Sequence, residues 1–162
     1  KRRTSIHETG HALIALLNGI PVESISIKSE IGSLGRVCLK ADHRDMTEGH
    51  CIKLLAMLLG GRNAERIILG DNSAGCSEDY KRANDLATKM SEVYGMGDIG
   101  VDSKVMFLKK ADQMATELLT KHKELLLKIS DELIKGKSFS GDELKKMVDE
   151  CANGQSDWSE PA

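Results

Sequence analysis

The residue types best suited to chemistry lie near the start of this 162-residue chain, in the stretch His7-Glu8-Thr9-Gly10-His11. On a helix, positions i and i+4 lie on one face, one turn apart, so both imidazoles can bind one zinc ion at about 2.0–2.1 Å. Glu8 projects beside them and can reach a water molecule at that ion. The spacing therefore predicts metal-assisted hydrolysis with Glu8 as the general base.

This H-E-x-x-H pattern is the signature of zinc peptidases. Average amino-acid frequencies would produce it by chance in well under about 1% of chains of this length. The alternative is an amphipathic helix whose two histidines are exposed and bind no metal. Because the motif lies inside a good helical segment, where the backbone is rigid, the metal interpretation is favoured.

Two histidines do not complete such a site, because a catalytic zinc ion normally takes three protein ligands and a water molecule. Some candidates lie in a polar, turn-like stretch, where solvated surface is the default, and others lie on helices that could face the first one. Spacing alone does not choose among the six candidates, which are His43, His50, Glu65, Glu78, Asp79 and Asp85.

The elements that must position these residues are mainly helical. Apolar residues at helical spacing predict a first helix up to about Asn18. Val22–Lys28 and Leu34–Lys40 predict two short strands, joined by a linker that contains Gly32. A two-stranded hairpin is marginal by itself, so these strands must pack against helices.

A second helical region is expected to begin at a Thr47 cap and to run to Leu59. Gly60-Gly61 indicates a break or a close backbone approach, and a short helix then covers Arg62–Leu69 and ends at Gly70.

Three more helical regions complete the predicted fold. Ser77 is expected to cap a helix through about residue 94, whose buried face would comprise Tyr80, Ala83, Leu86, Ala87 and Met90. Residues 101–135 contain no glycine or proline, so they predict one long helix or a tight pair, with His122 packed inside. A capping box of Ser140 and Glu143 predicts a last helix to about residue 151.

Composition excludes several classes of protein. A net charge of −2 and a pI near 6.2 argue against a nucleic-acid binder. No apolar run approaches the roughly 20 residues of a membrane span, and no signal peptide is recognisable. The length fits one domain, expected over residues 1–152, with a polar and disordered tail over residues 153–162.

The four cysteines form no C-x-x-C pair, which excludes a cysteine zinc ribbon and predicts free thiols in a reducing, intracellular compartment. The chain begins without a methionine, so we expect it to be a piece of a longer protein that can carry an anchor or a second domain. No G-x-x-x-x-G-K-[S/T] loop occurs, so this chain alone should not bind ATP.

Three further blocks resemble those of one family, the peptidase domain of FtsH-type AAA metalloproteases. Residues 60–66, Gly-Gly-Arg-Asn-Ala-Glu-Arg, are similar to its G-G-R-A-A-E-E. Residues 74–80, Ala-Gly-Cys-Ser-Glu-Asp-Tyr, resemble its T-G-A-S-N-D-L, and residues 94–97, Tyr-Gly-Met-Gly, resemble its Y-G-M-S. With the metal motif, these blocks occur in the family's order and extend the resemblance over about residues 1–150.

The resemblance implies a mainly helical zinc endopeptidase that degrades unfolded or membrane-extracted proteins. It implies His7 and His11 as zinc ligands, Glu8 as general base and Asp79 as third ligand. On the predicted helix, Asp79 also lies one turn from Ala83, on the inward side.

The resemblance further implies partners outside this chain. In the family an ATPase module on the same polypeptide delivers the substrate, and six subunits form a ring. The full-length protein would be membrane-anchored, with this domain in the cytoplasm, matrix or stroma. The predicted strand at Leu34–Lys40 matches the region where the family accepts substrate as an added strand.

One departure from the family pattern leaves two other functions open. Only about Asp98–Val101 separates the Y-G-M-S-like block from the C-terminal helices, where the family usually has a long mobile segment that helps to frame the active site. A catalytically impaired pseudo-protease, or a ring-forming domain that binds peptides, is therefore the main alternative. A helical interaction module that binds no metal is the other.

Overall fold

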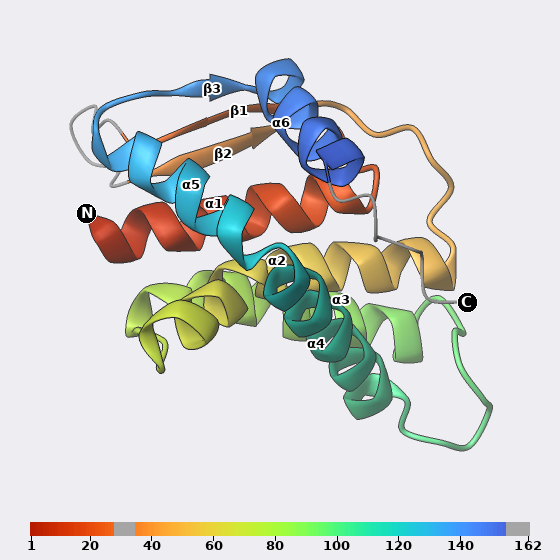
Figure 1. Cartoon of the computed structure of the whole chain (residues 1–162). Helices are drawn as coiled ribbons and strands as arrows, with labels where there is room; N and C mark the ends of the chain where they lie inside the picture. The colour runs from red at the N-terminus through yellow and green to blue at the C-terminus, as the bar shows by residue number, and fades with distance from the viewer. Residues whose placement is uncertain (28–34, 155–162) are drawn as a thin grey trace.

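Six helices, one 3₁₀ turn and three short strands make up the part of the chain that the computed structural model describes, residues 1–27 and 35–154 (Figure 1). In chain order they are α1 (Arg2–Leu17), β1 (Val22–Ser26), β2 (Arg36–Leu39), α2 (Glu48–Leu69), η1 (Ala74–Cys76), α3 (Ser77–Glu92), α4 (Lys104–Lys121), α5 (Lys123–Ile134), β3 (Phe139–Ser140) and α6 (Gly141–Gly154). The mainly helical fold with a small sheet is as predicted.

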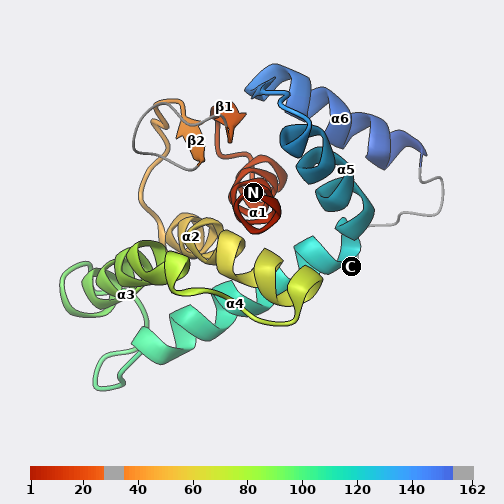
Figure 2. The same cartoon turned by 90° about the vertical axis from the view of Figure 1, so that its left-hand side faces the viewer.

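The first helix lies at the centre of the fold. Viewed along its axis, α1 is surrounded by α2, the sheet, α5 and α6, while α3 and α4 lie beyond α2 (Figure 2). Its apolar side chains on several faces are at most 1% exposed, namely Ile6, Ala12, Leu13, Ile14 and Ala15. The segment that carries the metal motif is therefore held by packing on most sides.

The helix α2 is continuous, so the predicted break at Gly60-Gly61 and the separate short helix at Arg62–Leu69 are wrong. The second reading of these glycines, a close backbone approach, is confirmed. A Cβ atom on Gly10 of α1 would lie 2.4 Å from the carbonyl oxygen of Gly60. A glycine inside a helix costs only about 1 kcal/mol, and here the loss is offset by the close packing of α1 on α2.

We expect Gly10→Ala to destabilise the protein by about 1–3 kcal/mol, because overpacking forces backbone or neighbouring atoms to move. The added methyl group would also lie 2.6 Å from Ala64 Cβ. Gly49→Ala is the matched control, since nothing lies within 4 Å of a Cβ atom there and alanine favours the helix. Urea unfolding measures both, and a Gly10→Ala variant as stable as the wild type would refute this account of the helix crossing.

The sheet has the strand order β2-β1-β3, with both pairs antiparallel. The third strand was not predicted, because β3 is only two residues long and pairs with β1 through Ser24↔Ser140 and Ile25↔Phe139. The predicted cap that follows is confirmed, since Ser140 Oγ accepts a hydrogen bond of 3.1 Å from the Glu143 N–H. Among the described residues, β2 pairs on one side only and forms an edge of the sheet.

The start of α3 differs from the prediction. Ser77 is inside the helix; the cap position belongs to Cys76, without a side-chain cap. Instead, Ser73 Oγ accepts a hydrogen bond of 3.2 Å from Gly75 N–H in the preceding turn η1. The buried face of α3 comprises Ala83, Ala87 and Met90. Tyr80 lies one turn before them, at the N-terminal end of the helix, and is 49% exposed, so it is not part of the core.

The C-terminal part forms a pair of helices, α4 and α5, which meet at His122. A pair is one of the two forms that the sequence predicted. His122 is buried, as expected. The expected linker residue Gly32, the strand ends at Lys28 and Leu34, and the tail from residue 155 onward lie outside the described residues. None of the described helices has the length and apolar character that a membrane span requires.

Candidate metal centre and active site

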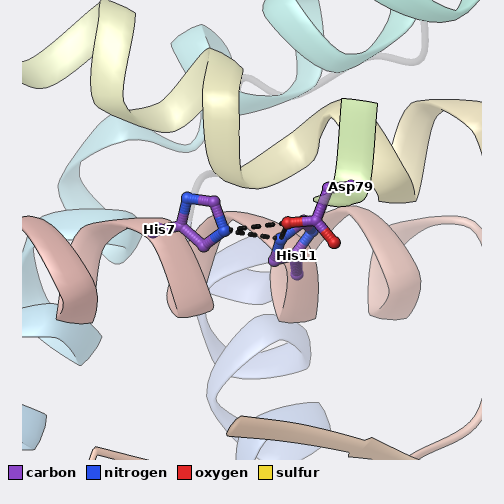
Figure 3. Close-up of side chains that lie close together, drawn as sticks. All are labelled: His7, His11 and Asp79. Atoms are coloured by element: carbon purple, nitrogen blue, oxygen red, sulfur yellow. Dashed lines mark hydrogen bonds and ion pairs between the residues drawn. The ribbon is translucent and has the colours of Figure 1, made fainter. Parts of the chain in front are cut away.

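Three side chains from two helices meet at one point: His7 and His11 of α1 and Asp79 of α3 (Figure 3). The two Nε2 atoms lie 3.0 Å apart, and each lies 3.0 Å from Asp79 Oδ2. Each imidazole is 12% exposed and the carboxylate 23%, so the point they share can still be reached by solvent. Of the six candidate third ligands, the structure places Asp79 at the two Nε2 atoms.

The outer nitrogen of each ring is directed at an acceptor. His11 Nδ1 lies 2.7 Å from the Met57 carbonyl oxygen, to which it donates its proton, and His7 Nδ1 lies 3.4 Å from Glu65 Oε2. In a neutral imidazole the other nitrogen then keeps its lone pair. Both Nε2 lone pairs are therefore directed at a carboxylate oxygen, an arrangement that suits a cation between them.

The electrostatics of Asp79 agree with this. Burial works to raise the pKa of its carboxyl group, but the close interactions with the His11 and His7 rings outweigh burial and hold that pKa well below its ordinary value. The carboxylate is thus ionised at neutral pH and available as a ligand.

The donor set also fits zinc in number and spacing. Two imidazole nitrogens and one carboxylate oxygen are the three-ligand set of many catalytic zinc sites, with one position left for water or substrate. Donor atoms that share a tetrahedral zinc ion at about 2.0–2.1 Å lie about 3.3–3.4 Å apart. The 3.0 Å spacing in the structure needs only a small expansion to reach that value.

A glycine of α2 makes room for the two rings. A Cβ atom on Gly61 would lie 2.6 Å from both Nε2 atoms, of His7 and of His11. Real Cβ atoms do not come so close to other atoms, so a side chain at this position would push the imidazoles out of place.

We therefore expect Gly61→Ala to lower zinc affinity about 10- to 100-fold, the range seen when supporting groups around a metal site are lost. A competition titration against a chromogenic chelator measures the affinity, and Gly49→Ala on the same helix is the control. Unchanged zinc affinity in Gly61→Ala would show that the rings do not need the space that the glycine leaves.

Glu8 lies beside the three donor atoms and is partly buried. Burial is the main cause that raises the pKa of its carboxyl group, and a hydrogen bond from the Val37 N–H of β2 works in the opposite direction. With His11 and Asp79, Glu8 lines a cavity of about 380 Å³. The other wall of this cavity includes Arg36, Val37 and Leu39 of β2, so the edge strand borders the candidate site.

Glu65, another candidate ligand, lies behind His7 and contacts its Nδ1 atom, not the shared point. The carboxylate is 1% exposed and accepts hydrogen bonds from Arg3, Ser73 and Cys76. Burial works to raise the pKa of Glu65, but the hydrogen bonds from Cys76 and Arg3 hold it below its ordinary value. Burial, with the neighbouring Glu65, raises the pKa of the Cys76 thiol to about 12, so the thiol is protonated and donates.

The remaining candidates lie elsewhere. His43, Glu78 and Asp85 are exposed, and His50 is buried against Asp42 at 3.4 Å. The sequence reasoning missed three groups that the structure places around the histidines, which are the Met57 carbonyl, Gly61 and Cys76. Of these three, only Gly61 could be noticed in the sequence, because a Gly-Gly pair is unusual within a helical stretch.

Comparison with known proteins points to one family. The model of peptidase family M41 matches residues 1–104 of this chain. The ATP-dependent zinc metalloprotease FtsH 2 of Symbiobacterium thermophilum is 38% identical over 101 residues, covering 60% of this chain and 17% of that protein. The ATP-dependent zinc metalloprotease FtsH of Syntrophobacter fumaroxidans is 31% identical over 188 residues, covering 93% of this chain and 29% of that protein.

A third relative, the ATP-dependent zinc metalloprotease FtsH 2 of Thermoanaerobacter sp., is 32% identical over 162 residues and is matched by 89% of this chain. The match covers 32% of that protein. The chain thus spans about a third or less of the length of these curated relatives.

Proposed function

This chain belongs to peptidase family M41, and we propose that it is a zinc-dependent endopeptidase domain that hydrolyses peptide bonds of unfolded or extracted proteins. The observation that carries the proposal is the meeting of His7 Nε2, His11 Nε2 and Asp79 Oδ2, each 3.0 Å from the other two, beside the partly buried carboxyl group of Glu8. A metal-ligand set and a general base next to a cavity are the parts that metal-assisted hydrolysis requires.

In this proposal His7, His11 and Asp79 hold the zinc ion. The bound ion would polarise the carbonyl of the substrate and make the attacking water more acidic. Glu8 takes the proton of that water and passes it to the leaving amine. Its partial burial supports this role, because a raised pKa brings a carboxyl group closer to the operating pH of a general base.

The substrate site that we propose is the edge strand β2. An extended peptide can add to such an edge through main-chain hydrogen bonds, with side-chain pockets for specificity. Two features support this placement: β2 pairs only with β1 among the described residues, and Arg36, Val37 and Leu39 line the cavity that contains Glu8. A peptide on this edge would pass beside the catalytic groups.

The larger context is also part of the proposal. We infer an ATPase module elsewhere on the full-length polypeptide, a ring of six subunits and a peptidase unit that covers residues 1–152. Each relative described above carries the words ATP-dependent in its name and is about three times as long as this chain or longer, which supports a second module. We infer that this domain lies in the cytoplasm, matrix or stroma, and that the full-length protein is anchored in a membrane.

One observation favours the alternative, a catalytically impaired relative that binds peptides. The link between α3 and α4 is short, and two of its apolar residues face solvent, with Ile99 fully exposed and Val101 59% exposed. A short link leaves less chain to frame the substrate than the resemblance implies.

Cleavage of casein by the purified chain, loaded with zinc, decides between them. The proposal expects cleavage that stops with a chelator and returns with zinc, while circular dichroism shows that the chelated protein stays helical. Zinc binding without any cleavage would favour the impaired relative. A chain that binds no zinc would contradict both and leave a helical interaction module.

A further inference from the structure

A second group of donor atoms lies on the opposite side of the His7 ring. Glu65 Oε2 lies 3.4 Å from His7 Nδ1 and 2.6 Å from Cys76 Sγ, and Cys76 Sγ lies 3.7 Å from His7 Nδ1. We propose that His7, Glu65 and Cys76 form a second cation site, selective for thiophilic divalent ions, that competes with the zinc centre for His7.

The second site is fixed in place by its surroundings. Glu65 is 1% exposed and Cys76 is 3% exposed. The other carboxylate oxygen, Glu65 Oε1, accepts hydrogen bonds of 3.2 Å from both Arg3 and Ser73. These bonds hold the carboxylate so that Oε2 faces the ring and the thiol.

Two cavities give a cation access to this buried cluster. One, of about 290 Å³, is lined by His7 and Glu65 together with Arg3 and Ser73. The other, also about 290 Å³, reaches Cys76 from the side of Tyr80. A small ion can therefore approach the cluster without unfolding of the helices around it.

The sulfur atom decides which cations prefer this site. Thiolate is a soft ligand, whereas the zinc centre offers only imidazole nitrogen and carboxylate oxygen. The other cysteines, Cys38, Cys51 and Cys151, belong to no three-donor cluster in the described part of the chain. Cadmium is thus expected to bind at Cys76, while zinc, a borderline ion, is expected to occupy the other centre.

Competition follows from the proton balance of His7. A cation at Nδ1 needs the lone pair of that nitrogen, so the ring proton moves to Nε2, where Asp79 Oδ2 at 3.0 Å accepts its hydrogen bond. The Cys76 proton is released to solvent as the thiolate binds. With a proton on Nε2, the neutral ring has no lone pair left for the zinc centre, so His7 can serve one ion at a time.

The test is a titration of metal-free protein with Cd²⁺, followed by the ultraviolet absorption of the cadmium–thiolate bond. We expect one equivalent with a thiolate band in the wild type. Cys76→Ala should lose the band and bind Cd²⁺ weaker by on the order of 10- to 100-fold. Cys151→Ala, which removes a thiol outside the cluster, should behave as the wild type. A band that persists unchanged in Cys76→Ala, or no band in the wild type, would overturn the proposal.

A second arm separates this site from the proposed function, because only the competition rests on the role of His7 in the zinc centre. Asp79→Asn should keep the cadmium–thiolate band, since none of the three donors of the second site is altered. In zinc-loaded wild type, Cd²⁺ should release zinc as the band grows, and in Cys76→Ala the same concentration should release far less. Zinc retained beside a full thiolate band would refute the competition. Loss of the band in folded Asp79→Asn would refute the second site.

Discussion

Glu8→Gln should keep zinc but lose peptide cleavage, with a fall in the rate of about 10²- to 10⁴-fold, the usual contribution of a general base. The amide cannot take a proton from water, yet it has nearly the same shape as the carboxyl group. Glu8 is not one of the three groups whose atoms meet at the shared point, so its replacement leaves the ligand set intact.

Casein cleavage and zinc analysis of the same preparation test this expectation. Glu78→Gln is the matched control, because it removes an exposed carboxylate from α3 and should cleave casein as the wild type does. Cleavage at the wild-type rate by Glu8→Gln would take the role of general base away from this residue. Loss of zinc together with activity would instead make Glu8 part of the metal site.

Asp79→Asn should lose most of its zinc affinity, by about 100-fold or more, which exceeds the roughly 10- to 100-fold loss typical of groups that only support a ligand. The substitution removes the single negative charge from a site whose other donors are neutral imidazoles, and Asp79 Oδ2 lies 3.0 Å from each of them. The low pKa of Asp79 already reflects this close interaction with the two rings.

The measurement is a chelator competition, supported by the thermal stability of the protein with and without zinc. A ligand at about 100 times its dissociation constant stabilises the folded state by about 2.7 kcal/mol, so the wild type should melt at a higher temperature with zinc. The Asp79→Asn protein should show little of this shift, and Glu78→Gln should show all of it. Wild-type affinity in Asp79→Asn, with a loss in Glu65→Gln, would assign the third ligand to Glu65.

What could be predicted from the sequence was mostly local. The i and i+4 spacing of His7 and His11 depends on one helix, so it could be recognised without knowledge of the fold. The same holds for the Ser140 cap, where the local pattern and the local structure agree.

What could not be predicted depends on contacts between distant segments. Asp79 is 68 residues from His11, and spacing alone did not separate it from Glu65. The Gly60-Gly61 pair was ambiguous, because a glycine pair can end a helix or allow close packing. The structure shows that α2 continues through it and that Gly61 leaves room for two imidazoles of α1. Cys76 carried no signal of its own, and its place behind His7 depends on the turn between α2 and α3.

The most direct test of the central claim is zinc K-edge X-ray absorption on the protein loaded with one equivalent of zinc. The account predicts only nitrogen and oxygen ligands at about 2.0–2.1 Å, with the multiple-scattering signature of two imidazoles, from His7 and His11. The same spectrum of Asp79→Asn should show a changed oxygen shell or little bound zinc. A sulfur ligand at about 2.3 Å in the wild type would contradict the account, because it would place the ion at Cys76 and not between the histidines and Asp79.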